Sequence, residues 1–370
     1  MRHVWNKSAH VAVTFLLIAL ALTLRAASLT SAAALSYAPE TTSEQTSAPT
    51  HDPLTETARP DTSRSDLLHY YQALQANSRP QNRTSRIRLQ TNLPNPATLP
   101  QPVRFQEVRG QGLLARVWIN GSGAYTFAID TGAGATILSR RVAREARVAL
   151  EGGESLRISG ISGQRSNRGE RARIRTLAFG ERDNPFPVNG LTVVADGLPE
   201  GLDGILDPTE TLSPLGYVLD LPNGVMSVFD PRQHPLRQSD TQVDETVVAW
   251  LTDAESRRPF VMLKGGRRAL LDTGSGFGLA VTEHAARAIG IVFQEGRERN
   301  ETRDLGGGRI GARRIRPVTV YLGGLALRRV PTDLLLGASP NAPILLGRDA
   351  LRPFQLTFDP ASRLIRIKVV

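Results

Sequence analysis

From about residue 103 onward, short apolar runs alternate with turns rich in Gly, Pro and Asn. The run 117–119 leads into a Gly-containing turn and is followed by the run 125–129. The same pattern returns at 260–263 and 269–271. Apolar runs of this length between turn residues are typical of strands and too short for helices. The pattern therefore predicts an all-β segment built from hairpins.

Landmarks in this segment recur along the chain. The triplet Asp-Thr-Gly closes a strand at 130–132 and again at 272–274, 142 positions later. Three further landmarks recur in the same order at offsets of about 137 to 145 residues: the glycine-rich segments 158–163 and 306–308, the segments 204–207 and 344–347, and the hairpins 217–229 and 354–369. Such a succession predicts an internal duplication. We expect one β unit at 103–235 and a second at 236–370.

A single Asp-Thr-Gly triplet would carry little weight, since these residues also form an ordinary turn after a strand. The prediction depends on two copies, each at the same place in the repeat.

The first 35 residues have the pattern of an export signal. Arg2 and Lys7 precede an apolar run of 14 residues at 11–24, which Arg25 ends. A membrane-spanning helix needs about 20 apolar residues, whereas this length suits the apolar region of a secretory signal. We expect a signal peptide at 1–35, with an uncleaved membrane anchor as the alternative. Either would place the protein outside the cytoplasm, in the periplasm or the extracellular space.

Residues 36–102 are rich in Ser, Thr, Pro, Asn and Gln. This composition cannot bury enough apolar surface to order itself. We expect a disordered linker here, or a pro-segment.

Composition narrows the chemistry that the chain can perform. There are no cysteines, which excludes disulfides, thiolate metal sites and Cys nucleophiles. The six histidines include no HExxH pair, so a zinc site is not expected. We expect neither a metal nor an organic cofactor.

The net charge of +10 arises from 45 basic and 35 acidic residues. The arginines are spread along the chain and are not interleaved with aromatics, so we do not expect a nucleic-acid partner. One run, Arg140, Arg141, Arg144 and Arg147, has the spacing of a short helix with an exposed basic face. It is expected to be solvated surface, with contact to an anionic membrane or envelope polymer as the alternative.

The segments around the two triplets resemble the retropepsin-like and pepsin-like clan of aspartic peptidases. AIDTGAGATIL and LLDTGSGFGLAV resemble the active-site loops, ISGISG resembles a flap, and ILLGRDAL resembles the hydrophobic-hydrophobic-Gly motif that closes a lobe. The resemblance covers about 103–370 and implies an all-β, bilobal acid-protease fold. In that fold, two fused retropepsin-like units place the active site between them. Two positions depart from the pattern: Asp207 replaces the Gly of the first closing motif, and Gly278 stands where the first unit has Thr136.

The resemblance also implies roles for individual residues. Two neighbouring carboxyl groups would share one proton and activate a water, and flaps would hold an extended peptide. The implied catalytic pair is Asp130 and Asp272; the supporting loop residues are Thr131, Gly132, Thr273, Gly274 and Ser275; the flap residues are Gly160, Ile161, Gly163, Gly306, Gly307 and Gly308.

One detail follows from the residue after each triplet. The Ser275 hydroxyl could donate a hydrogen bond to Asp272, whereas Ala133 cannot do so for Asp130. We therefore expect Asp272 to hold the negative charge and Asp130 the shared proton.

The leading hypothesis is an exported aspartic endopeptidase that hydrolyses protein or peptide substrates as a monomeric pseudo-dimer. One alternative is a non-catalytic peptide-binding pseudoprotease or envelope scaffold with the same fold. Another is a dimerisation module, in which each unit pairs in trans with a second chain.

Overall fold

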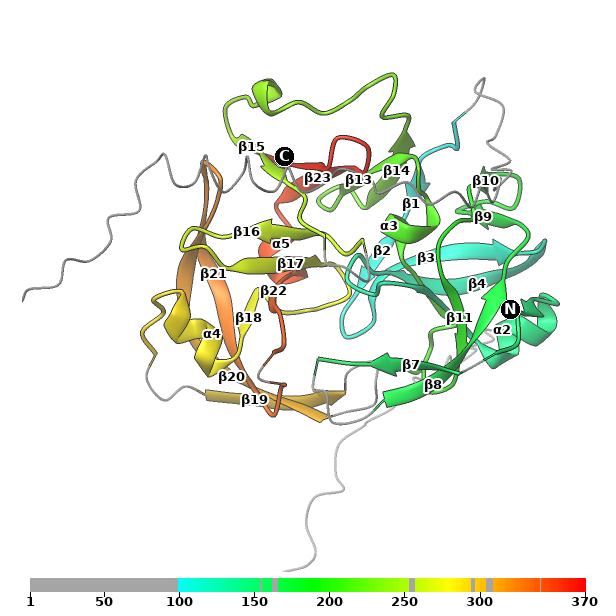
Figure 1. Cartoon of the computed structure of the whole chain (residues 1–370), viewed down its shortest axis with the longest axis horizontal. Helices are drawn as coiled ribbons and strands as arrows, with labels where there is room; N and C mark the ends of the chain where they lie inside the picture. Colours follow the sequence, from blue (N-terminus) through cyan, green and yellow to red (C-terminus); the bar gives the residue numbers. More distant parts are fainter. Residues whose placement is uncertain are drawn as a thin grey trace, which may run out of the picture. The chain divides into compact units, whose positions relative to one another are not determined.

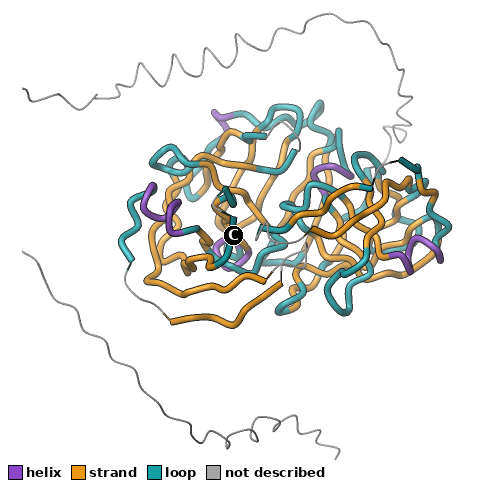
Figure 2. The backbone as a smooth tube through the Cα atoms, turned by 60° about the horizontal axis from the view of Figure 1, so that its bottom comes forward, coloured by secondary structure: helices purple, strands orange, loops and turns teal. Residues whose placement is uncertain are grey.

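Strands dominate the computed structural model (Figures 1 and 2). The residues that it describes lie within the compact unit Ile87–Val370 and are 99–153, 155–161, 166–252, 257–293, 297–303, 309–339 and 341–370. The all-β class expected from the sequence is confirmed. The expected signal segment lies outside these residues, as does almost all of the expected linker. Among the helices that the structure describes, none is long and apolar enough to cross a membrane.

The first sheet contains eleven strands from the first half of the β-rich segment, residues 103–235. Its main order is β10-β9-β3-β4-β12-β5-β11-β8-β6, with β2 paired to β3 and β7 to β8. Strand β12 runs parallel to β4, and β11 runs parallel to β5. The bounds are β2 (Gln106–Val108), β3 (Gly112–Ile119), β4 (Ser122–Ile129), β5 (Thr136–Ser139), β6 (Ala149–Leu150), β7 (Leu156–Ser159), β8 (Ser166–Arg173), β9 (Leu177–Phe179), β10 (Pro185–Phe186), β11 (Thr192–Ala195) and β12 (Gly204–Leu206).

The second sheet contains seven strands in the order β16-β17-β22-β18-β21-β20-β19. Its first six strands repeat the order and the relative directions of β3-β4-β12-β5-β11-β8 in the first sheet. In each sheet the last of these six strands also pairs antiparallel with the strand before it in the sequence, β8 with β7 and β20 with β19. The bounds are β16 (Phe260–Met262), β17 (Arg268–Asp272), β18 (Leu279–Val281), β19 (Arg297–Arg303), β20 (Arg309–Leu322), β21 (Leu325–Leu336) and β22 (Ile344–Gly347).

A six-stranded sheet joins residues 103–235 to the second half of the β-rich segment, residues 236–370, in the order β1-β14-β13-β23-β24-β15. At its centre β13 pairs antiparallel with β23, so that Tyr217 faces Phe358. Their rings stack with centroids 4.5 Å apart, and both side chains are fully buried. The sheet therefore carries part of the hydrophobic core from one half into the other. The bounds are β1 (Val103–Arg104), β13 (Gly216–Asp220), β14 (Val225–Phe229), β15 (Glu245–Ala249), β23 (Phe354–Asp359) and β24 (Leu364–Val369).

The described helices are short: α2 (Arg140–Glu145), α3 (Pro208–Thr211), α4 (Glu283–Ala288), α5 (Arg348–Leu351) and the 3-10 turn η1 (Gln238–Asp240). Helix α2 coincides with the expected basic helix, and the Ser139 hydroxyl caps its N-terminus. Arg140 forms ion pairs with Glu170 and Asp196 on the surface. Part of the basic run is therefore neutralised within the fold.

Replacing Phe358 by Ala should destabilise the protein by about 3–5 kcal/mol, because the change opens a cavity against Tyr217 at the centre of the joining sheet. Urea unfolding measures this free energy. Val292, which is 93% exposed, provides the control. Val292→Ala should change stability by no more than about 0.5 kcal/mol, and equal effects of the two changes would contradict the central place of the stacked pair.

Candidate active site

The two Asp-Thr-Gly triplets begin at equivalent places in the two sheets. Asp130 follows the buried end of β4, and its N–H donates to Leu206 O of the parallel strand β12 at 2.9 Å. Asp272 ends β17 and lies in register with Gly347 of the parallel strand β22. Each carboxyl is thus held at the end of a strand that is hydrogen-bonded to its neighbour.

The fold brings the two loops into direct contact. A Cβ atom built on Gly132 would lie 2.8 Å from Cγ of Asp272, and one built on Gly274 would overlap the carboxyl of Asp130. Each glycine therefore packs against the carboxyl group of the opposite loop. A side chain at either position would push the two carboxyls apart, which explains why both positions hold glycine.

Backbone N–H groups hold the carboxyls in place. Gly132 donates to Asp130 Oδ1 at 2.8 Å, while Gly274 and Ser275 donate to Asp272 Oδ1 at 3.0 and 3.1 Å. Such bonds orient a carboxylate without the conformational freedom of a side-chain donor.

Two threonines cross-link the loops. The Thr131 hydroxyl donates to Leu271 O at 2.6 Å and accepts from the Thr273 N–H at 3.1 Å. The Thr273 hydroxyl donates to Ile129 O at 3.0 Å and accepts from the Thr131 N–H at 3.1 Å. Both threonines are fully buried. The four reciprocal bonds leave the loops little freedom to separate or slide.

Burial and mutual repulsion shift the titration of the pair upward. Burial raises the pKa of Asp130, against the opposing effect of the Gly132 N–H. Burial, followed by the negative charge of Asp130, raises the pKa of Asp272 to about 8. Since the two carboxyls also interact by a hydrogen bond, the shared proton belongs to the pair.

The pKa shifts favour the reverse of the proton placement expected from the sequence. That expectation assumed a hydrogen bond from the Ser275 hydroxyl to Asp272. Instead, the Ser275 hydroxyl accepts the N–H of Phe277 at 3.3 Å, and only the Ser275 N–H contacts Asp272. Both pKa values are raised, and the repulsion from Asp130 adds to the rise at Asp272, which favours the proton on Asp272.

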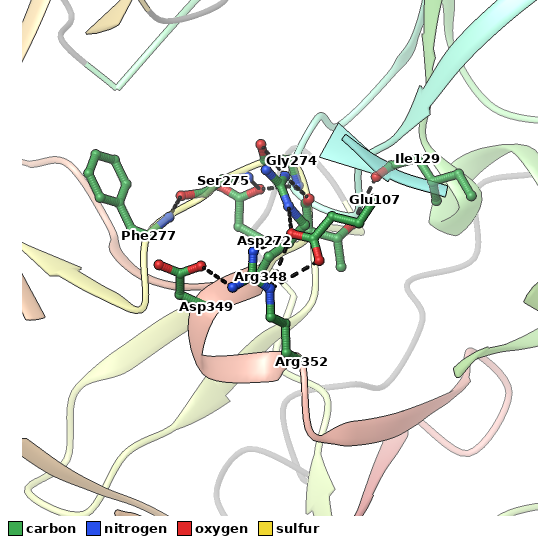
Figure 3. A network of polar contacts seen from close by, with 10 residues as sticks. Glu107, Ile129, Asp272, Gly274, Ser275, Phe277, Arg348, Asp349 and Arg352 are labelled. Atoms are coloured by element: carbon green, nitrogen blue, oxygen red, sulfur yellow. Dashed lines mark hydrogen bonds and ion pairs between the residues drawn. The ribbon is translucent and has the colours of Figure 1, made fainter. Parts of the chain in front are cut away.

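The sequence-based reading missed Arg348, the first residue of α5. Its side chain is buried and donates through Nη1 to Thr273 O and Gly274 O at 2.6 and 2.9 Å (Figure 3). Its Nε lies 3.4 Å from Glu107 Oε1 of β2, which in turn pairs with Arg352. Arg348 thus ties the second loop to the first half. Its positive charge also partly opposes the rise in the pKa values of Asp130 and Asp272. The signal in the sequence was the Arg directly after Ile-Leu-Leu-Gly.

The expected flaps correspond to the hairpins β7–β8 and β19–β20. Gly160 and Ile161 follow β7, and Ile161 O accepts the Ser339 N–H of the second half at 3.2 Å. The first hairpin therefore reaches the opposite half. The remaining expected flap residues, Gly163, Gly306, Gly307 and Gly308, lie outside the described residues.

In chemical terms, burial and mutual repulsion favour a state of the two carboxyls in which one proton is shared between them. The ionised member can act as a base and the protonated member as an acid. Within the described ranges, no three His, Asp or Glu side chains form a cluster that could hold a metal ion.

Thr131→Val keeps the shape of the side chain but removes its hydroxyl. The Thr273 N–H and Leu271 O would lose their partner in a buried place, at a cost of about 1–3 kcal/mol for each group. Thr131→Ser retains the hydroxyl and is the matched control. Urea unfolding should give a clearly larger free energy of unfolding for the serine variant than for the valine variant. Equal free energies would show that the Thr131 hydroxyl does not stabilise the contact between the loops.

The comparison with known proteins finds a similarity in the first half of the β-rich segment. A family model described as aspartyl protease matches residues 115–206. No curated protein matches the chain significantly. The match includes Asp130, Thr131 and Gly132 and ends at the last residue of β12. The segment that positions the first carboxyl is therefore similar to aspartyl proteases, on a fold of the all-β aspartic protease type.

Proposed function

We propose that the chain is an aspartic endopeptidase that hydrolyses peptide bonds with a water activated by Asp130 and Asp272. The observation that carries the proposal is the contact between the two loops, in which each glycine packs on the opposite carboxyl. The aspartyl protease match at 115–206 supports it.

The proposed reaction follows from the protonation of the pair. A water held between the carboxyls gives a proton to Asp130 as its oxygen attacks the peptide carbonyl carbon, while Asp272 donates its proton to the carbonyl oxygen. The tetrahedral intermediate then collapses and the C–N bond breaks. Asp130 gives the proton that it took from the water to the leaving nitrogen, and a hydroxyl of the intermediate returns a proton to Asp272 as the carboxyl product forms, so the pair again holds one proton. The buried cross-link keeps both carboxyls in place throughout.

Several broader features belong to the same proposal. The matching strand orders of the two sheets support a duplicated unit, with both triplets in one chain forming the site. Hairpins β7–β8 and β19–β20 are proposed to hold an extended peptide by backbone hydrogen bonds. Export to the periplasm or extracellular space, with or without an N-terminal anchor, remains proposed from residues 1–35.

Asp130→Asn and Asp272→Asn should each reduce cleavage of a peptide library by about 10³-fold or more, because the two carboxyls act as one unit. Asp183→Asn, at an exposed position, should cleave like the wild type. The assay is mass spectrometry of the library after incubation with the full chain. Cleavage that survives either active-site change would exclude the assigned pair.

If neither the wild type nor any variant cleaves, while the wild type still binds the library peptides, the alternative of a non-catalytic peptide-binding module is favoured. Light scattering on the same sample separates a monomer from pairing in trans.

The rate should depend on pH as a bell. At low pH both carboxyls are protonated, and the base appears as pH rises through the raised pKa of Asp130. Since the pKa of Asp272 lies at about 8, the acid is lost above that pH. Values of kcat/KM between pH 3 and 10 test this. A rate that keeps rising above pH 9 would contradict the shared proton.

A further inference from the structure

A third buried aspartate, Asp207, follows the strand adjacent to that of Asp130 and has no part in the mechanism above. Asp207 follows β12 directly, and β12 lies parallel to β4 with Leu206 opposite Ile129. Asp130 follows Ile129 in the same way. The two aspartates are therefore the next residues along two adjacent parallel strands, which places Asp207 next to Asp130.

The second half has a glycine at this place. Gly347 lies in register with Asp272, and a Cβ atom on it would lie 2.9 and 3.0 Å from O and Oγ of Ser275. There is no space for a side chain. In the first half, Ala133 replaces Ser275 and has no hydroxyl, so the carboxyl of Asp207 makes the two halves of the site chemically different.

Asp207 is fully buried, and only one of its two carboxyl oxygens has a hydrogen-bond partner. Its Oδ1 accepts the N–H groups of Thr209 and Glu210 at 2.9 and 3.3 Å, which caps α3. Its Oδ2 is buried without a hydrogen-bond partner. A carboxylate would leave a charged oxygen unsolvated there, whereas a protonated carboxyl leaves only a neutral hydroxyl.

The surroundings add no positive charge to balance an ionised Asp207. The titratable groups that face it are Glu210 on α3, Asp130 after β4, and the Tyr217 phenol on β13, which hydrogen-bonds Thr209. In the described part of the chain, no basic side chain pairs with Asp207. Burial, Glu210 and Asp130, in that order, raise its pKa well above the ordinary value.

We propose that Asp207 is a positioning residue that stays a neutral carboxylic acid in the folded protein and thereby lets Asp130 carry the negative charge of the pair. Its place beside Asp130 makes the two charges mutually exclusive. As pH rises, the second charge therefore enters at Asp272 and not at Asp207, and that loss of the acid ends activity. The catalytic part of this inference rests on the proposed peptidase function; the protonation state of Asp207 does not.

Asp207→Asn tests the inference, because Asn is neutral, has the same shape and caps helices well. Since Asp207 is already neutral in the wild type, both limbs of the kcat/KM profile should stay in place. An acid limb that moves to lower pH in the variant would mean that an ionised Asp207 raises the pKa of Asp130 in the wild type, and this result overturns the proposal.

Unfolding gives a readout that does not need activity. A free Asp titrates near pH 4, and the folded protein holds the proton of Asp207 to higher pH. The folding equilibrium constant of the wild type, relative to Asp207→Asn, should therefore fall by about tenfold for each pH unit above this value until Asp207 ionises. A ratio that does not vary with pH contradicts the neutral state.

Two further variants complete the experiment. Asp207→Ser also caps a helix and is neutral, so it should show the same pH signature if the Asn variant folds poorly. Asp359→Asn is the control for the loss of a buried carboxyl in another sheet, and it should leave both limbs of the profile in place.

An infrared difference spectrum between the wild type and Asp207→Asn at pH 7 should contain the C=O stretch of one protonated carboxyl. A carboxylate band in its place would overturn the proposal. If the wild type cleaves nothing, the proposed function fails, and the unfolding and infrared measurements still decide the protonation of Asp207.

Discussion

The reciprocal hydrogen bonds between Thr131 and Thr273 are the interaction on which the rest of the site depends. Each hydroxyl bonds to the N–H of the other threonine and to a carbonyl oxygen just before the opposite triplet. Two buried carboxyls repel each other once both are charged. The cross-link opposes their separation, since moving the loops apart would leave buried polar groups without partners.

The sheets supply the rigidity behind this contact. Each triplet comes at the end of a strand that is hydrogen-bonded to a parallel neighbour, and the joining sheet connects the halves through Tyr217 and Phe358. Arg348 adds a polar tie from the second loop to Glu107 of the first half. The position of each carboxyl is therefore set by long-range contacts from several directions.

The two halves share strand order but differ in their chemistry at the site. The second has Ser275, Gly347 and Arg348, whereas the first has Ala133, Asp207 and Pro208 at the corresponding positions. Arg348 favours the charged form of both catalytic candidates, while Asp207 would oppose charge on Asp130 if it ionised. An inequivalent pair suits a reaction in which one member begins as a base and the other as an acid.

The sequence alone was sufficient to predict the all-β class and the strands that precede each triplet, and it named Asp130 and Asp272 as candidates, whose loops the fold brings into contact. These features depend on local apolar patterns and on a motif that occurs twice, both of which are visible in a linear chain. It could not give the pKa shifts of the two carboxyls, because these depend on which atoms the Ser275 hydroxyl contacts and on how deeply each carboxyl is buried. Nor could it reveal the roles of Arg348 and Asp207. Arg348 is one arginine among many and Asp207 is one departure from a motif, and their importance shows only when the fold places them near the two active-site loops. Tertiary structure decided these points because pKa values, reciprocal hydrogen bonds and unsatisfied buried atoms arise from residues that are distant in sequence.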